Sequence, residues 1–112
     1  MKNNPKLRGA LGLAMRAGKI KFGFDTVKES VTNGLAEFVL IATDLSEKSE
    51  KEIRFVCSKY NVSVIKTGYD MEDFKTAIGK KTGIVSVVDS GFAKMILKVT
   101  DNGEEWVYAD KM

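Results

Sequence analysis

The sequence predicts an α/β fold in which one sheet lies between layers of helices within a single domain. Two observations lead to this prediction. Short apolar segments alternate along the chain with segments of helical periodicity, and most of the apolar segments lack the polar alternation of a half-exposed strand. The 112 residues are 44% hydrophobic and 29% charged and include one proline, which is typical of one folded soluble domain.

The first third of the chain is predicted to form a helix, a short strand and a second helix. Pro5 suits the first turn of the first helix and Gly18 its C-terminal end. After the short stretch 19–22, the second helix begins near Asp25 and ends at residues 33–34, an Asn-Gly pair common at left-handed caps. The apolar positions expected to be buried are Leu7, Ala10, Leu11, Ala14, Val27 and Val31.

The rest of the chain continues this alternation. The three further predicted strands are residues 38–42, 62–66 and 84–88. A long helix capped by Ser46 or Asp44 separates the first two, and a short helix between Asp70 and Gly79 separates the last two. A final helix is predicted at residues 91–97. The apolar helix positions expected to be buried are Ile53, Val56, Cys57, Tyr60, Phe74, Ala77, Ile78, Phe92 and Ile96.

Positive charge is concentrated at the start of the chain. Residues 1–28 contain seven Lys/Arg and one Asp, residues 29–98 contain ten charges of each sign, and residues 99–112 contain one Lys and four acidic residues. A basic segment of this kind is typical of proteins that bind polyanions, although a solvated face that only aids solubility would look the same. We predict a domain over residues 1–98, followed by an acidic C-terminal extension, residues 99–112. This extension would form either a hairpin around its Asn-Gly pair or a partly ordered segment.

The sequence gives little support to an enzyme or a metal site. It contains no histidine, which is the commonest general base and metal ligand. Cys57 lies on an apolar helix face, where a buried structural thiol is expected rather than a nucleophile. Glu47, Glu50 and Glu52 lie among basic residues, the pattern of a solvated helix face. We therefore expect no enzymatic activity, no cofactor and no metal.

The sequence also favours a cytoplasmic protein without a membrane partner. The longest apolar run, residues 38–42, is too short to cross a bilayer, and the N-terminal residues lack the apolar core of a secretory signal. A single cysteine cannot form an intramolecular disulfide, which fits a reducing compartment. We expect the chain to be a monomer.

Two glycine-containing segments approach nucleotide-binding motifs without matching them. AIGKKTG, residues 77–83, contains a Gly-Lys pair at 79–80, but a phosphate-binding loop needs a glycine five residues before that pair and a Ser/Thr directly after it. Phe74 and Lys81 occupy these two positions. GALGLA, residues 9–14, lacks the third glycine of a dinucleotide fingerprint and lies inside a helical pattern. The first segment therefore indicates a basic turn before a strand, or simply a helix end with solvated lysines.

The segment RAGKIKFGFDTVKE, residues 16–29, is the strongest candidate for a binding site. Gly23 precedes a predicted helix whose first backbone N–H groups have no partner within the helix, and such a start binds phosphate oxygens readily. An ordinary strand-to-helix turn is the alternative. The basic residues around it are Arg16, Lys19, Lys21 and Lys28.

Several motifs occur in an order that resembles the ribosomal protein L7Ae superfamily, and within it the bacterial YlxQ-type members. They are RAGK followed by Gly23 (residues 16–23), LIATD (40–44), AIGK (77–80) and GFAK (91–94), and the resemblance covers about residues 7–98. The resemblance implies a three-layer α-β-α sandwich with a mixed, mainly four-stranded sheet. It also implies binding of structured RNA, often kink-turns in ribosomal or other non-coding RNA.

The resemblance also implies a set of RNA-binding positions. In kink-turn binders the glycine matched by Gly23 is followed, after one variable residue, commonly by Asn-Glu or Lys-Gln, and three residues later by a lysine. Here Asp25 and Thr26 occupy the positions of that pair, and Glu29 occupies the position of the lysine. The Asp25 carboxylate cannot donate a hydrogen bond, and Glu29 would repel a phosphate. The predicted RNA-binding residues are Arg16, Lys19, Lys21, Gly23, Phe24, Asp25, Thr26, Lys28, Thr43, Asp44, Lys80, Lys81, Thr82 and Gly83.

These observations lead to one functional hypothesis and one alternative. We expect a non-enzymatic, ribosome-associated protein that binds kink-turn-like or otherwise bent RNA through a basic surface at a helix N-terminus. The alternative is a protein–protein interaction module of the same fold. Stress-response members of that fold bind proteins, and the C-terminal extension carries Trp106 among acidic residues, as a docking segment could.

Overall fold

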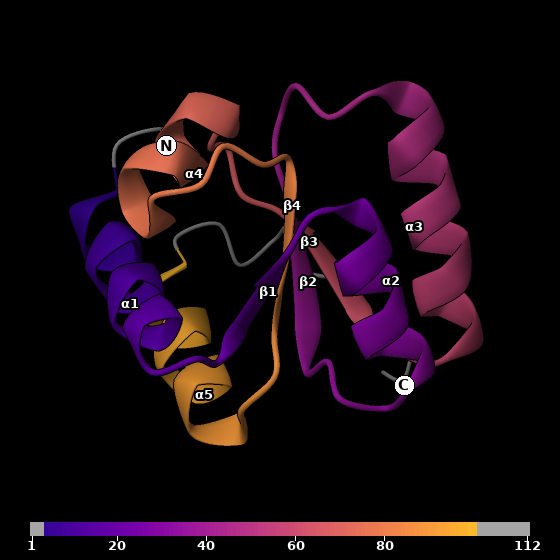
Figure 1. Ribbon diagram of the computed structural model, residues 1–112, viewed down its shortest axis with the longest axis horizontal. Helices are drawn as coiled ribbons and strands as arrows, with labels where there is room; N and C mark the ends of the chain where they lie inside the picture. Colours follow the sequence, from indigo (N-terminus) through magenta and orange to yellow (C-terminus); the bar gives the residue numbers. More distant parts are fainter. Residues whose placement is uncertain (1–3, 101–112) are drawn as a thin grey trace.

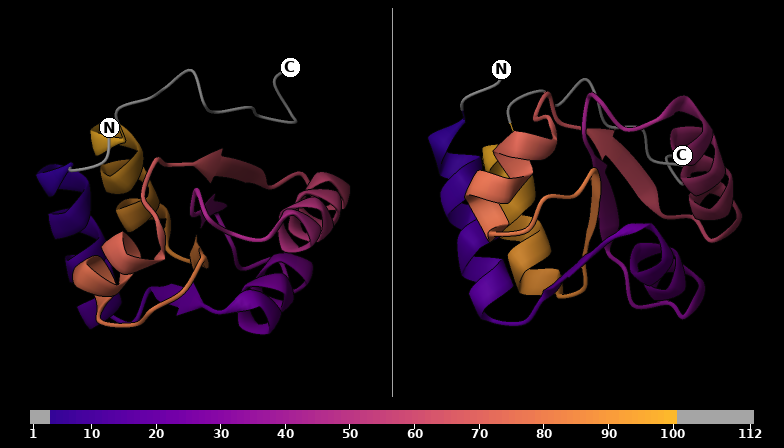
Figure 2. Two further views of the ribbon diagram at one scale, coloured as in Figure 1. Left: turned by 90° about the horizontal axis from the view of Figure 1, so that it is seen from above. Right: turned by 45° about the horizontal axis from the view of Figure 1, so that its top comes forward.

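A computed structural model describes residues 4–100 and confirms the three-layer α-β-α sandwich with a mixed four-stranded sheet. Helices α1, α4 and α5 cover one face of the sheet, and α2 and α3 cover the other (Figure 1); Figure 2 shows the same two helical layers from other directions. The helices are α1 (Pro5–Arg16), α2 (Phe24–Thr32), α3 (Glu47–Lys59), α4 (Met71–Ile78) and α5 (Ser90–Val99). The strands are β1 (Ile20–Phe22), β2 (Phe38–Ile41), β3 (Ser63–Lys66) and β4 (Ile84–Val87).

The sheet has the strand order β1-β4-β2-β3. Strands β2 and β3 are parallel and joined through α3, whereas β4 runs antiparallel to both β1 and β2. Every residue of β2 and β4 is buried, because a helical layer covers each face of these central strands. This burial explains why the two segments, apart from Ser86 in β4, are apolar throughout rather than alternating.

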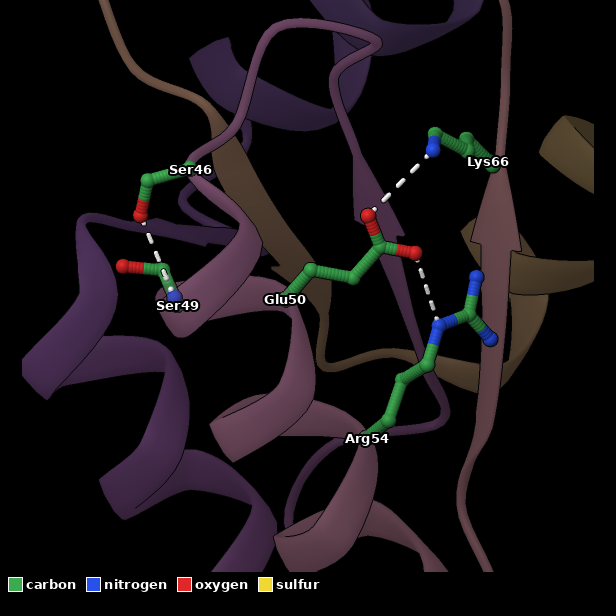
Figure 3. A network of polar contacts seen from close by, with 5 residues as sticks. All are labelled: Ser46, Ser49, Glu50, Arg54 and Lys66. Atoms are coloured by element: carbon green, nitrogen blue, oxygen red, sulfur yellow. Dashed lines mark hydrogen bonds and ion pairs between the residues drawn. The ribbon is translucent and has the colours of Figure 1, made fainter.

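Local capping signals in the sequence fix most helix ends. Pro5 is the first residue of α1, and the Asn4 side chain accepts a hydrogen bond from the Leu7 N–H. Ser46, rather than Asp44, caps α3 by accepting from the Ser49 N–H (Figure 3). Helix α4 begins with a capping box formed by the Asp70 and Asp73 side chains and ends at Ile78, followed by the C-cap Gly79, which is left-handed with φ +84°.

One predicted core position was wrong. Tyr60 is 46% exposed and is the C-cap of α3, not part of its buried stripe. The helix ends at Lys59 because Asn61 takes a left-handed conformation with φ +58°, so the fourth position of the apolar repeat leaves the helical face. Phe92 and Ala77 are half-buried, and the remaining predicted core residues are buried. Helix α2 begins at Phe24, one residue before the predicted start.

An ion-pair network holds α3 to the edge strand β3. The Glu50 carboxylate accepts hydrogen bonds from Arg54 Nε at 2.9 Å and from Lys66 Nζ at 3.2 Å (Figure 3). Burial raises the pKa of Glu50, but these two hydrogen bonds and the two positive charges outweigh burial and hold that pKa below its ordinary value. The carboxylate therefore stays charged and links the helix to the strand.

A buried polar cluster ties the start of α1 to the end of α5. The Tyr69 hydroxyl donates to the Asn4 backbone oxygen at 2.7 Å, and Asn4 Nδ2 donates to the Val99 oxygen at 2.8 Å. Burial raises the pKa of Tyr69, so its hydroxyl remains a donor at neutral pH. Across residues 4–100 there is no helix with both the length and the apolar character needed to cross a membrane. The possible hairpin in the C-terminal extension lies outside the described residues.

Candidate nucleic-acid interface

Helix α2 begins without a side-chain cap. Gly23 occupies its N-cap position with φ +90° and ψ +146°, and no side chain accepts a hydrogen bond from the first turn. In contrast, side chains of Asn4, Ser46, Asp70 and Asp89 cap the other four helices that the structure describes. The first N–H groups of α2 are therefore without a side-chain acceptor at the positive end of the helix dipole, which favours negative charge, and the acidic Asp25 lies in the same turn.

A glycine is needed at this position because of its conformation. A Cβ atom built on Gly23 would meet no described atom within 4 Å, so space is open in front of the backbone. The positive φ, however, is a conformation that L-residues rarely adopt. Open space and bare amides together allow another backbone to approach closely.

Thr82 holds the start of α2 against the sheet. The Gly23 N–H is shared between the Ile84 oxygen at 3.2 Å and Thr82 Oγ1 at 3.3 Å. The same hydroxyl accepts from the Ile84 N–H at 3.2 Å and donates to the Ile84 oxygen at 2.9 Å. Thr82 is only 8% exposed, so it positions the site rather than presenting its own hydroxyl to a ligand.

The β2–α3 connection joins the same corner. The Ala42 N–H donates to the Gly83 oxygen at 2.9 Å, and a Cβ on Gly83 would come within 2.9 Å of the Leu45 side chain. The Asp44 carboxylate accepts from the Met71 N–H at 3.0 Å, which ties this connection to α4. Three segments far apart in the sequence thus meet at one end of the sheet. We call residues 23–26, 42–44 and 79–83 the junction surface.

Two exposed cations flank the junction surface on its α1 side. Arg16, in the last turn of α1, is exposed, and its Nη1 atom lies 3.7 Å from a Cβ built on Gly12. The same Cβ would lie 3.3 Å from the Ala77 oxygen, so the Arg16 guanidinium lies beside the last turn of α4. The exposed Lys80 follows that turn by two residues. These two predicted residues are therefore brought to the same side of the molecule.

Lys21 lies on the other side of the sheet. It pairs in register with Ser86, whose side chain faces α2 through a 2.8 Å hydrogen bond to Ser30. Lys21 lines a shallow depression of about 160 Å³ together with Thr26 and Glu29 of α2. Lys21 therefore shares this depression with the acidic Glu29, on the α2 side of the sheet. The half-buried Lys19 directly precedes β1.

Two of the predicted cations are already paired. Lys28 Nζ lies 3.2 Å from the Glu52 carboxylate of α3, and Lys81 Nζ lies 3.0 Å from the Glu72 carboxylate of α4. All four side chains are at least 42% exposed, so each pair contributes less than about 1 kcal/mol and a phosphate can compete for the lysine. Sequence position does not reveal these partners, because each ion pair forms only when separate elements pack together.

The remaining predicted site residues divide into exposed and supporting positions. Asp25, Thr26 and Thr43 are exposed, while the half-buried Phe24 packs on the α2/α3 side of the core. Sequence reasoning missed the buried pair Ser30–Ser86 that docks α2 onto β4, for which the only signal was a serine inside an apolar strand.

The described residues offer no clear alternative chemistry. Burial raises the pKa of the Cys57 thiol to about 12, against the opposing positive charge of Arg54, so the thiolate is not available at neutral pH. Within residues 4–100 no three side chains of His, Cys, Asp or Glu are grouped so that they could hold a metal ion.

Comparison with known proteins identifies a family. The model of the ribosomal protein L7Ae/L30e/S12e/Gadd45 family matches residues 5–97. The RNA-binding protein YlxQ of Enterococcus faecium is 34% identical over 92 residues, which cover 82% of this chain and 88% of the relative. YlxQ of Bacillus subtilis is 31% identical over 96 residues, which cover 81% and 91%. The large ribosomal subunit protein eL30 of Saccharomyces cerevisiae is 28% identical over 95 residues, which cover 81% and 89%.

Solved structures share this architecture. A protein of unknown function from Bacillus halodurans C superposes with a TM-score of 0.79 at 28% identity, covering 87% of this chain and 98% of the other. The 15.5kD RNA binding protein of Giardia lamblia superposes with a TM-score of 0.70 at 18% identity, covering 89% and 86%. At that identity the second comparison shows the fold alone.

Proposed function

Because the chain belongs to the ribosomal protein L7Ae/L30e/S12e/Gadd45 family, we propose that it is a non-enzymatic RNA-binding protein that uses the junction surface. Two of its relatives are named RNA-binding proteins and another is a ribosomal protein. The observation that carries the proposal is the uncapped start of α2 at Gly23, held beside the α4–β4 loop by Thr82.

Each group at the junction surface has a distinct role toward RNA. The amides of residues 24–26 and the cations Arg16 and Lys80 bind phosphate oxygens, with Lys81 joining when its exposed ion pair opens. Lys19 adds positive charge before β1, whereas Glu29 and Glu52 partly offset the charges of Lys21 and Lys28 along α2. Phosphate contacts fix position and give affinity but read no sequence.

The RNA should be bent rather than straight. Amides at one helix start and cations on two sides of it reach phosphates of a folded backbone more readily than those of one regular duplex groove. Asp25 and Thr26 are exposed where they can contact an unpaired base edge. Glu29 beside Lys21 lowers the net positive charge at that point, so base-specific recognition of a standard kink-turn should be weaker than phosphate binding. Because a relative is a ribosomal protein, we also propose association with the ribosome in the cytoplasm.

Binding of a kink-turn RNA and of a straight duplex of the same composition tests this proposal. We expect tighter binding of the bent RNA, with log affinity falling as log salt rises by nearly one unit per phosphate neutralised. The double variant Arg16→Glu/Lys80→Glu should lower affinity strongly and reduce the salt slope by about 1.8 for two lost contacts. The double variant Lys94→Glu/Lys98→Glu on α5 makes the same change in net charge and should bind as the wild type does.

The possible outcomes separate the parts of the proposal. Equal loss of affinity in both double variants would show that net charge, and not the junction surface, attracts RNA. Equal binding of bent and straight RNA would remove the preference for a bend. Absence of RNA binding together with capture of a specific protein would favour the interaction-module alternative. Co-sedimentation of the chain with ribosomal particles on a sucrose gradient tests the ribosome association.

A further inference from the structure

A groove lies between α5 and the edge strand β3, on the face of the sheet covered by α1, α4 and α5. Its volume is about 240 Å³, and its apolar lining includes Phe38, Ile65, Ala93 and Leu97. Lys94 and Glu37 also line it, and with the neighbouring Lys98 the cations outnumber this carboxylate two to one. A hollow of the adjoining surface is lined by Lys94, Leu97 and Lys98 together with Met95, which is 37% exposed. Apolar lining with cations beside it suits a segment that is both aromatic and acidic.

The chain itself supplies a segment of this composition. Residues 101–112, which lie outside the described part of the structure, read DNGEEWVYADKM and carry four acidic residues against one lysine. The central EEWVY combines two carboxylates with three residues that favour extended structure. We propose that this segment folds back onto the domain, with the Trp106 side chain in the α5–β3 groove and Glu104 and Glu105 facing Lys94 and Lys98.

The geometry of the chain exit fits this path. Helix α5 ends at Val99, and Thr100 is already extended with φ −80° and ψ +114°. The next three residues, Asp-Asn-Gly, favour a turn that reverses the chain toward the groove. The groove lies along α5 between Ser90 and Leu97, about 10 Å of helix, and the four residues 104–107 span about 13 Å when extended. The segment is therefore long enough to place its aromatic residues over the groove.

The groove and the junction surface lie at opposite ends of the sheet. Phe38 and Ser63, which line the groove, are the first residues of β2 and β3. The junction surface contains the residues that follow β2 and precede β4, and Figure 1 shows these connections at the top, away from the start of α5. A docked extension therefore leaves the junction surface open. The inference does not rest on the proposed RNA binding.

Trp106 is the only tryptophan in the chain, so its fluorescence reports directly on docking. In the native 112-residue chain we expect emission shifted to the blue, and acrylamide quenching several-fold weaker, relative to the same chain in concentrated urea. Lys94→Glu/Lys98→Glu should bring quenching close to the value in urea while circular dichroism stays native, because both residues are exposed. Arg16→Glu/Lys80→Glu is the matched control and should leave Trp106 protected.

An NMR measurement locates the indole. Nuclear Overhauser contacts between the Trp106 indole ring and the methyl groups of Leu97 would place it in the groove, and contacts to another face would overturn the assignment. Quenching in the native protein equal to that in urea would show that the segment does not dock. A blue shift that grows with protein concentration would show that the groove receives the extension of a second copy, which also contradicts folding back within one chain.

Discussion

Replacing Thr82 by valine tests whether its hydroxyl holds the start of α2. Valine keeps the shape of the side chain but removes the acceptor of the Ile84 N–H at 3.2 Å and the second acceptor of the Gly23 N–H at 3.3 Å. The Ile84 N–H therefore loses its acceptor, whereas the Gly23 N–H still donates to the Ile84 oxygen. We expect the free energy of unfolding to fall by about 1–3 kcal/mol.

Urea unfolding measures this loss, and Thr76→Val is its matched control. The Thr76 hydroxyl also donates to a backbone oxygen, that of Glu72 at 3.2 Å, but in an exposed position. Water can replace that bond, so the control should change stability by less than about 0.5 kcal/mol. An equal loss of unfolding free energy in the two variants would show that burial of the Thr82 hydroxyl does not set the cost of removing it.

The same variant connects stability with binding. At a temperature where Thr82→Val is fully folded, its Kd for bent RNA should rise, because the amides of residues 24–26 are no longer held in one position. The rise should stay below about tenfold, or 1.4 kcal/mol, since the cations of the junction surface remain. A variant that loses stability but binds RNA as the wild type does would show that the start of α2 is not part of the interface.

Three further predictions concern single residues. Gly23→Ala should lower the free energy of unfolding by about 1–2 kcal/mol and weaken RNA binding, because φ is +90° at that position. Gly9→Ala, on the exposed side of α1, should instead raise the free energy of unfolding by about 0.5–1 kcal/mol, and urea unfolding measures both changes. Burial raises the pKa of Glu50, but its hydrogen-bonded cations outweigh burial and lower that pKa in the folded state. The wild type should therefore be more stable than Glu50→Gln above pH 4.5, by under about 1 kcal/mol, and this difference should vanish as pH falls through the lowered pKa. Burial raises the pKa of Cys57 to about 12, so the thiol should react with a disulfide reagent only as fast as the protein unfolds; rapid reaction of the native protein would contradict its burial.

Helix and strand positions could be predicted because their signals are local. The Asn4–Pro5 start of α1 and the Asp70 start of α4 each lie within a few residues of the backbone groups that they satisfy. The failure at Tyr60 has the opposite cause. Its spacing continues the apolar repeat, but the next residue, Asn61, leaves the helix, so position in the repeat no longer determines the face.

The candidate site could be predicted only in part, because its assembly depends on long-range contacts. Gly23 was recognisable as a helix start, but its hydrogen bond to Thr82 joins residues 59 positions apart. Likewise, the exposed pair of Lys28 with Glu52 and that of Lys81 with Glu72 arise from packing between separate elements. A sequence can therefore indicate which residues carry charge, but not which of these charges already have a partner.

The start of α2 links the fold most directly to the proposed function. A Ser or Asp at position 23 would cap the helix with an ordinary negative φ, whereas the observed φ of +90° suits glycine, which has no side chain to accept a hydrogen bond from the first turn. The Gly23 N–H donates to the Ile84 oxygen and to Thr82 Oγ1, which holds Gly23 in this conformation, so the uncapped start is an ordered feature and not a frayed end. Because side chains cap the other four described helices, the uncapped start of α2, whose first turn also carries the acidic Asp25, is the feature on which the proposed phosphate binding most depends.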